Sequence, residues 1–225
     1  MWPGGGKRRA VLAVALAVLA PLPIAARGSS AESAAEFAER LQRKYDAVLD
    51  FSADFVQSYV GGALRKRTTE RGTVLVKKPG KMRWQYTAPE EKLFLADGRK
   101  MYSWVPADKQ VVVREMPADG EATTPLLFLV GKGSLVRDFV PSYTTVPDAP
   151  EATIALKLTP RRREGDYEWL AVVVDRDTLM IRMLVAVDGQ GGTSTFTFTR
   201  LKENVGVPDR SFAFSIPRDA DVVTQ

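Results

Sequence analysis

From Phe51 onward the sequence alternates between apolar and polar residues, and this alternation constrains the fold more than any other feature. Successive side chains of a β-strand point to opposite faces of a sheet, so a period of two predicts strands with one buried face. The segments with this pattern are 51–60, 71–78, 82–87, 92–96, 100–105, 110–115, 152–159, 168–175, 179–187, 193–202 and 211–215. Turn-forming pairs such as Pro79-Gly80, Asp97-Gly98 and Asp188-Gly189 separate many of them. Short strands with regular turns predict a large antiparallel sheet that is curled or closed.

One amphipathic helix is predicted before the strands. Apolar residues recur at spacings of three and four between Ala34 and Leu49, with charged residues between them. This spacing gathers the apolar side chains into one stripe along a helix. The Pro-containing stretch 141–150 is predicted to be an extended connection, because strands continue on both sides of it. Residues 32–225 are therefore expected to form a single domain that is mainly β with some α.

The first 31 residues are expected to be a signal peptide. Lys7, Arg8 and Arg9 precede an unbroken run of Ala, Val and Leu over 10–20, and a Pro-broken stretch of small residues follows. That three-part order is typical of a secretory signal. The apolar run is shorter than the roughly 20 residues that cross a bilayer. Cleavage is expected between residues 26 and 31, and an uncleaved N-terminal anchor is the alternative.

Loss of this segment would remove most of the excess positive charge. The whole chain has a net charge of +5, and residues 1–31 hold four basic residues and no acidic one, so the product would have +1. Nucleic-acid-binding domains carry a strong basic surplus, so no nucleic-acid partner is expected. The basic clusters at 65–67, 77–78 and 161–163 are interpreted as solvated loops and strand edges. Attraction to anionic lipid headgroups or to an acidic protein surface is the alternative.

The composition argues against an enzyme. The chain has no Cys and no His, which excludes a disulfide, a thiol nucleophile, His-ligated zinc and a Ser-His-Asp triad. Asp175 and Asp177 are interpreted as turn residues, because Asp side chains bond to the backbone in turns. Neither a phosphate-binding glycine loop nor a metal-ligand spacing is found. A mechanism that uses a carboxylate or a lysine is left open by these absences, but no catalytic residue, metal or cofactor is expected.

Apolar residues exceed what a sheet with one buried face needs. Met82, Trp84 and Tyr86 alternate with polar residues, whereas Leu93, Phe94 and Leu95 run without interruption. Part of this surplus is expected to line a cavity, since the flexible Met thioether adapts to varied ligands. An ordinary core is the alternative interpretation.

A short apolar segment interrupts the strands. Thr124 suits a helix N-cap, Pro125 suits the first turn and Gly131 suits the end, and all five residues between are apolar. A surface helix usually has only one apolar face. The segment is therefore interpreted as a lid that faces an apolar cavity, and a helix buried in the core is the alternative.

Several ordered motifs resemble the LolA family of lipoprotein carriers. They are Phe51-Ser-Ala-Asp-Phe55-Val-Gln57, the segment from Gly72 to Trp84 with Lys77-Lys78-Pro79, then Pro89, Ala96-Asp97-Gly98, Tyr102 with Trp104, Thr124-Pro125 and Ser211 to Pro217. The match covers most of the chain after residue 31. Each motif alone is weak, but the ordered set with its spacing is specific.

The resemblance implies an unclosed, strongly curved antiparallel β-barrel with an N-terminal helix and a lid of short helices over an apolar cavity. It implies a monomeric periplasmic chaperone that takes acylated lipoproteins from an inner-membrane lipoprotein-releasing ABC transporter. Delivery would be to an outer-membrane lipoprotein receptor. That receptor is itself acylated on Cys, which this chain lacks. The alternatives on the same fold are a carrier of another exported lipid or glycolipid, and a periplasmic sensor or assembly factor.

The resemblance also suggests site residues. The positions that would face the acyl chains are Tyr59, Met82, Trp84, Phe94, Leu126 and Leu129. Lys78 stands where the family commonly has an arginine that latches the lid. Lysine keeps the charge but lacks the planar fork of five donors, so the latch is expected to be weaker or built differently.

Overall fold

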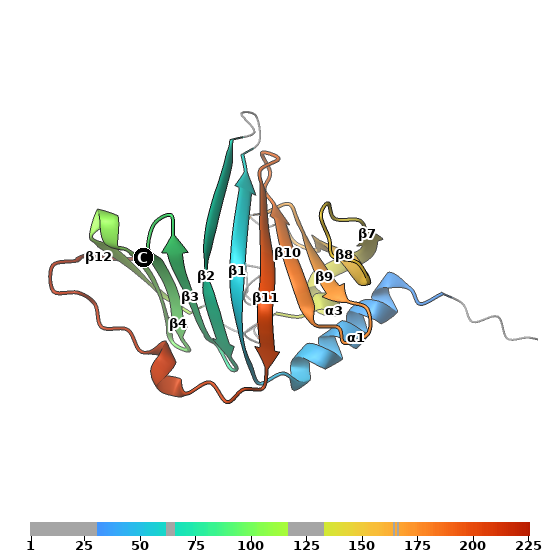
Figure 1. Ribbon diagram of the computed structural model, residues 1–225, viewed down its shortest axis with the longest axis horizontal. Helices are drawn as coiled ribbons and strands as arrows, with labels where there is room; N and C mark the ends of the chain where they lie inside the picture. The colour runs from blue at the N-terminus through green and yellow to red at the C-terminus, as the bar shows by residue number, and fades with distance from the viewer. Residues whose placement is uncertain (1–30, 62–65, 117–132, 164, 166) are drawn as a thin grey trace, which may run out of the picture. The chain divides into compact units, whose positions relative to one another are not determined.

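The computed structural model describes residues 31–61, 66–116, 133–163, 165 and 167–225, and residues Glu32–Gln225 form one compact unit. The strands in these residues are β1 Asp50–Val60, β2 Arg67–Lys77, β3 Lys81–Ala88, β4 Lys92–Asp97, β5 Lys100–Val105, β6 Gln110–Glu115, β7 Phe139–Thr144, β8 Thr153–Pro160, β9 Trp169–Asp175, β10 Ile181–Val187, β11 Thr193–Glu203 and β12 Asp221–Thr224. They form one sheet in the order β12-β6-β5-β4-β3-β2-β1-β11-β10-β9-β8-β7 (Figure 1). Neighbouring strands are antiparallel except β12, which is parallel to β6. The two free edges confirm the prediction of an unclosed, curled sheet.

Helix α1 (Ala34–Ala47) packs on one face of this sheet, which we call the concave face. Its N-terminus carries a capping box in which Ser33 and Glu36 satisfy each other's backbone N–H groups. Its buried residues Phe37, Leu41 and Tyr45 belong to the same core as the concave-face side chains of the strands. The predicted apolar stripe is therefore the surface that joins the helix to the sheet.

Tyr45 fixes the end of α1 against the far half of the sheet. Its hydroxyl accepts a hydrogen bond of 2.9 Å from the backbone N–H of Ile181 and lies 3.3 Å from Glu203 Oε1. Lys44 forms an ion pair with the same carboxylate. Two neighbouring helix residues thus contact β10 and β11, which holds the helix in one position.

Two strands differ from the sequence prediction. Residues 139–144 form β7, although 141–150 was expected to be a connection, because Pro141 lies on an edge strand where a missing N–H leaves no ladder bond unmade. Residues 211–215 were predicted to be a strand and are not. The 3-10 helix η2 (Asp209–Phe212) occupies part of that stretch, and the final strand is β12.

The segment between β11 and β12, residues 204–220, crosses the convex face of the sheet, and we call it the strap (Figure 1). The first residues of the strap are held by Asp50, whose buried carboxylate accepts hydrogen bonds from the backbone N–H groups of residues 205–207. Within the strap, η2 contacts β3 and β4, and Phe212 is only 2% exposed. Phe214 packs edge-on against Tyr102 with ring centroids 5.6 Å apart.

The strap explains why apolar residues occupy both faces of β4–β6. Strand pairing places Leu95, Tyr102 and Val113 opposite one another on the convex face, where Leu95 is 1% exposed. Their cover is the strap rather than the core under α1. Part of the apolar surplus noted in the sequence therefore forms a second, smaller packed layer.

The predicted lid over 124–131 lies outside the described residues. The described residues also include two short elements, the 3-10 helix η1 (Pro106–Asp108) and the helix α3 (Leu135–Asp138). Within the described residues, no helix has both the length and the apolar character needed to cross a membrane.

Candidate functional site

The concave face carries an apolar cavity of about 320 Å³ over strands β3–β6. Seven of the residues that border it have side chains on the concave face, and they are Met82, Trp84, Phe94, Met101, Ser103, Val112 and Arg114. Leu95 and Tyr102, which also border it, have side chains on the convex face. Most of this lining is apolar, and the charged member is one arginine at the β6 side. Such a cavity suits an apolar ligand.

Strand register builds the cavity from two rows of side chains that run across four strands. Met82, Ala96, Met101 and Arg114 are directly opposite one another in the first row, and Trp84, Phe94, Ser103 and Val112 in the second. Each row contains one small residue among large ones. Ser103, which lines the cavity, leaves open space that a larger side chain would fill, whereas Ala96 is fully buried in the core.

An aromatic cluster forms the wall between the cavity and the core. The ring of Trp84 contacts Phe55 and Phe196 edge-on, with centroids 4.9 Å and 5.2 Å away. Trp84 is 2% exposed, whereas Phe94 on the next strand is 38% exposed. Trp84 is therefore a core residue as well as a lining residue, and Phe94 presents its ring toward the ligand space.

The structure brings together three of the six predicted cavity residues, Met82, Trp84 and Phe94. Tyr59 is not among the lining residues. It lies near the end of β1, 39% exposed, and a Cβ built on Gly192 would stand 2.7 Å from its hydroxyl oxygen. Leu126 and Leu129 lie outside the described residues, so their assignment stays a prediction.

Of the seven bordering residues on the concave face, four were not among the predicted cavity residues, and they are Met101, Ser103, Val112 and Arg114. The alternation within 100–105 did place Met101 on one face, but it gave no indication of which face was concave. Ser103 and Arg114 are polar and carry no pattern typical of an apolar cavity. Only the register of β4 with β5 and of β5 with β6 shows that Ser103 and Arg114 lie on the face that carries the cavity.

Lys78 contacts the helix in this structure. Its ammonium group donates to the main-chain carbonyl of Tyr45, and its backbone N–H donates to the carbonyl of Leu49 at 2.8 Å. Burial lowers the pKa of this ammonium group, and nearby Asp46 opposes that shift. The lid lies outside the described residues, so the predicted latch contact stays a prediction.

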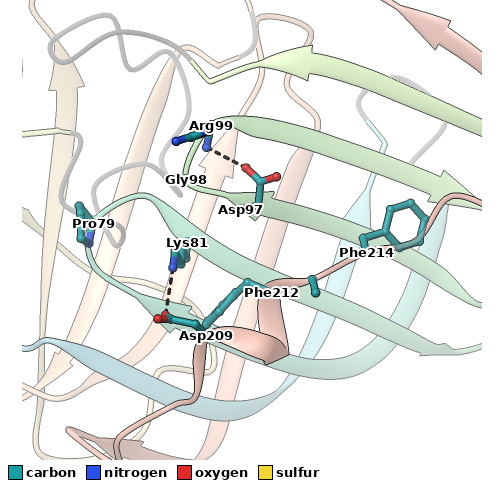
Figure 2. Close-up of a pocket in the computed structure, with 9 residues that line it drawn as sticks. Pro79, Lys81, Asp97, Gly98, Arg99, Asp209, Phe212 and Phe214 are labelled. Carbon is teal, nitrogen blue, oxygen red and sulfur yellow. Dashed lines mark hydrogen bonds and ion pairs between the residues drawn. The ribbon is translucent and has the colours of Figure 1, made fainter.

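A larger pocket of about 690 Å³ lies on the convex face, where the strap passes the turns after β2 and β4 (Figure 2). Lys77 and Lys81 each lie 2.9 Å from Oδ1 of Asp209, and these contacts lower the pKa of that carboxyl. Asp97 accepts at 2.8 Å from the backbone N–H of Arg99. Because its charged groups pair with one another in an open setting, we do not place the ligand site here.

The remaining acidic side chains do not suggest metal chemistry. Asp175 accepts hydrogen bonds from the backbone and hydroxyl of Thr178, which confirms its interpretation as a turn residue. In the part of the chain that the structure describes, no acidic cluster is placed to hold a metal ion.

Known proteins share both the sequence pattern and the fold. The model of the family described as outer membrane lipoprotein carrier protein LolA matches residues 46–215. An outer-membrane lipoprotein carrier protein from Cupriavidus pinatubonensis is 30% identical, and one from Cupriavidus taiwanensis is 29% identical; each comparison covers 97% of this chain and 100% of the relative. An uncharacterized conserved protein from Thermus thermophilus aligns with a TM-score of 0.51 at 13% identity, covering 84% of this chain and 99% of that one, which shows a similar fold alone. With its apolar cavity on the concave face of an unclosed sheet, the chain belongs to the LolA family of outer membrane lipoprotein carrier proteins.

Proposed function

We propose that this protein is a periplasmic chaperone that shelters the acyl chains of lipoproteins in the concave-face cavity. The observation that carries the proposal is the apolar cavity between the two rows of side chains on β3–β6. Each buried methylene contributes about 0.8 kcal/mol, so an acyl chain leaves a membrane readily only for another apolar environment. The Met, Phe and Trp side chains of the cavity provide that environment.

The direction of transport is part of the proposal. The carrier accepts acylated lipoproteins from an inner-membrane ABC transporter and delivers them to an outer-membrane receptor. The names of the relatives, which are outer-membrane lipoprotein carrier proteins, support this direction. The absence of Cys in the sequence supports a carrier rather than an acylated receptor. The chemistry is binding and release, with no bond made or broken.

Cavity size gives the carrier a means of release. The volume of about 320 Å³ lies at the lower end of the roughly 300–1,000 Å³ that ligand pockets span, too small for several acyl chains together. We therefore propose that loading widens the cavity and that the energy needed to widen it favours later release. Met82 and Met101 suit a lining that changes shape, because their thioethers are flexible.

Co-purification tests the proposal. The mature protein is expressed together with a lipoprotein and the releasing transporter, purified from the periplasm without detergent, and analysed for bound acylated lipoprotein by mass spectrometry. Ser103→Trp fills the gap in one row of the cavity, and Thr73→Trp adds the same ring on the convex face. We expect lipoprotein with the parent and with Thr73→Trp, and little with Ser103→Trp. A parent protein that carries no acylated lipoprotein would overturn the proposal.

A further inference from the structure

The concave face changes from apolar to polar at one level of the sheet. The last apolar residues before this change are Phe55 on β1, Trp84 on β3, Phe94 on β4 and Phe196 on β11. The polar residues come next in the direction of the arrowhead of β1 (Figure 1). The polar residues at that level come from five adjacent strands, β4, β3, β2, β1 and β11. We call them the polar band: Gln57, Glu70, Tyr86, Lys92 and Ser194. Strand pairing places Gln57 opposite Glu70 and Tyr86 opposite Lys92, so these side chains share the face.

The polar band adjoins the cavity directly. The ring of Tyr86 contacts that of Phe94, a lining residue, with centroids 5.6 Å apart. It also contacts Phe55 at 4.9 Å, on the aromatic wall. A ligand whose apolar part fills the cavity would therefore bring its next atoms to the band.

Hydrogen bonds inside the band run in one direction. The Tyr86 hydroxyl donates to Gln57 Oε1 at 2.6 Å, and Gln57 Nε2 donates to Ser194 Oγ at 2.9 Å. Burial raises the pKa of Tyr86, so its hydroxyl keeps the proton that it donates. Beside them, Lys92 forms an ion pair with Glu70 at 2.5 Å.

This direction leaves donors available at the end of the chain. The carbonyl oxygen of Gln57 already receives a hydrogen bond, whereas its amide nitrogen has a second hydrogen to donate. Ser194 accepts through its oxygen, and its hydroxyl hydrogen makes no hydrogen bond within the described residues. The group that complements such a site is one that accepts hydrogen bonds and donates none.

We infer that Gln57 and Ser194 bind the carbonyl oxygens of the linkages that join acyl chains to the glyceryl-cysteine end of a lipoprotein. Ester carbonyls accept hydrogen bonds without donating, and they lie where a lipid changes from apolar to polar. The inference rests on the proposed function and adds an orientation to it. The acyl tails lie toward Met82 and Met101, and the glyceryl end lies toward Val60.

Two synthetic triacyl lipopeptides test this subsite. One has the natural ester linkages, and the other has ethers in place of the two ester carbonyls. The variant Gln57→Leu/Ser194→Ala removes both donors from the concave face. The matched control Gln85→Leu/Ser58→Ala makes the same changes on the convex face of β3 and β1.

We expect the concave-face variant to bind the ester lipopeptide roughly thirtyfold more weakly, as the loss of two hydrogen bonds at about 1 kcal/mol each predicts. Its affinity for the ether analogue and both affinities of the control should match the parent. Equal weakening for both lipopeptides, or no weakening, would overturn the inference. A parent that binds neither lipopeptide would instead overturn the proposed function. Ser194→Ala alone, at a half-buried position, repeats the test with a smaller effect if the double variant unfolds.

Discussion

The ammonium group of Lys78 donates a hydrogen bond to the main-chain carbonyl of Tyr45, in the last turn of α1. The last carbonyls of a helix have no partner within it, and a cation there is favourable. This contact ties the residue after β2 to the helix on the concave face. Lys78 therefore has a structural role that does not depend on the lid.

Replacement of Lys78 is expected to reduce stability. Lys78→Leu removes the charged donor from the Tyr45 carbonyl, which still accepts from the backbone N–H of Val48 at 3.2 Å, and a hydrogen bond to a charged group contributes roughly 1.5–3 kcal/mol. We expect the free energy of unfolding, measured with urea, to fall by about 1–2 kcal/mol. The loss is below the full value of the hydrogen bond because removing a buried charge is itself favourable. Lys78→Arg should lose less. An unfolding curve unchanged in Lys78→Leu would show that the contact contributes nothing.

The latch role inferred from the family resemblance is a separate prediction. If the Lys78 ammonium group also reaches the lid in the empty carrier, Lys78→Leu should accept lipoprotein from the transporter but deliver it poorly to the receptor. Lys78→Arg should deliver as well as the parent or better, since its fork holds two carbonyls. Two-step transfer with purified components separates acceptance from delivery. Normal delivery by a folded Lys78→Leu carrier would rule out the latch.

A charge in the cavity should abolish binding. Phe94 lines the cavity and is 38% exposed, so Phe94→Asp is expected to fold in the empty state. An acyl chain would bury the carboxylate without a partner, at a cost of several kcal/mol. Binding of a fluorescent acyl probe should fall by at least tenfold. Val56→Asp, at a residue 42% exposed on the convex face, should bind normally. Retained binding by Phe94→Asp would exclude this residue from the site.

Removal of the strap's buried ring should destabilise the fold. Phe212 is 2% exposed against the convex face, and Phe→Ala in a core costs roughly 3–5 kcal/mol. Phe214 is less buried, so Phe214→Ala should cost clearly less. Thermal or urea unfolding of the two variants measures the difference. Equal costs would show that the convex-face layer is not packed as described.

Alkaline pH should unfold the protein through its buried tyrosines. Burial raises the pKa of Tyr45 and of Tyr86 above the ordinary value of 10.0, so the folded state retains protons that the unfolded state loses. Their contribution to the free energy of unfolding is present in full below pH 10 and decreases as the pH rises above it. In Tyr86→Phe, the free energy of unfolding should fall less steeply with pH over the titration range, roughly pH 9 to 11. Denaturant unfolding at several pH values measures this slope. An unchanged slope would contradict the burial of that hydroxyl.

Much of the fold follows from the sequence, because strands such as β1 and β3 alternate between buried and less buried side chains. The alternation in 51–60, 100–105 and 110–115 predicted β1, β5 and β6 within one residue. Alternation at Phe212 and Phe214 misled, since these rings pack onto a sheet face without joining its ladder. β7 was missed because it contains Pro141, and proline is uncommon in strands. This strand is at the edge of the sheet, where proline is tolerated.

The site was less predictable than the fold. Trp84 and Phe94 were found through a family resemblance, and the structure places both in the lining. Ser103 matters because it is small and stands between two large residues of its row, a relationship between strands that no single segment contains. Gln57 and Ser194 are 137 residues apart, and only the pairing of β1 with β11 brings them together.

The edges of the sheet bear on how an open sheet avoids aggregation. A free edge presents unpaired N–H and C=O groups that invite a strand from another chain. Pro141 removes a donor from β7 at one edge, and the other edge is β12, a strand of only four residues. Neither edge is a long, regular template. The sheet can therefore remain unclosed around a ligand space without recruiting strands from a second copy or from unfolded chains nearby.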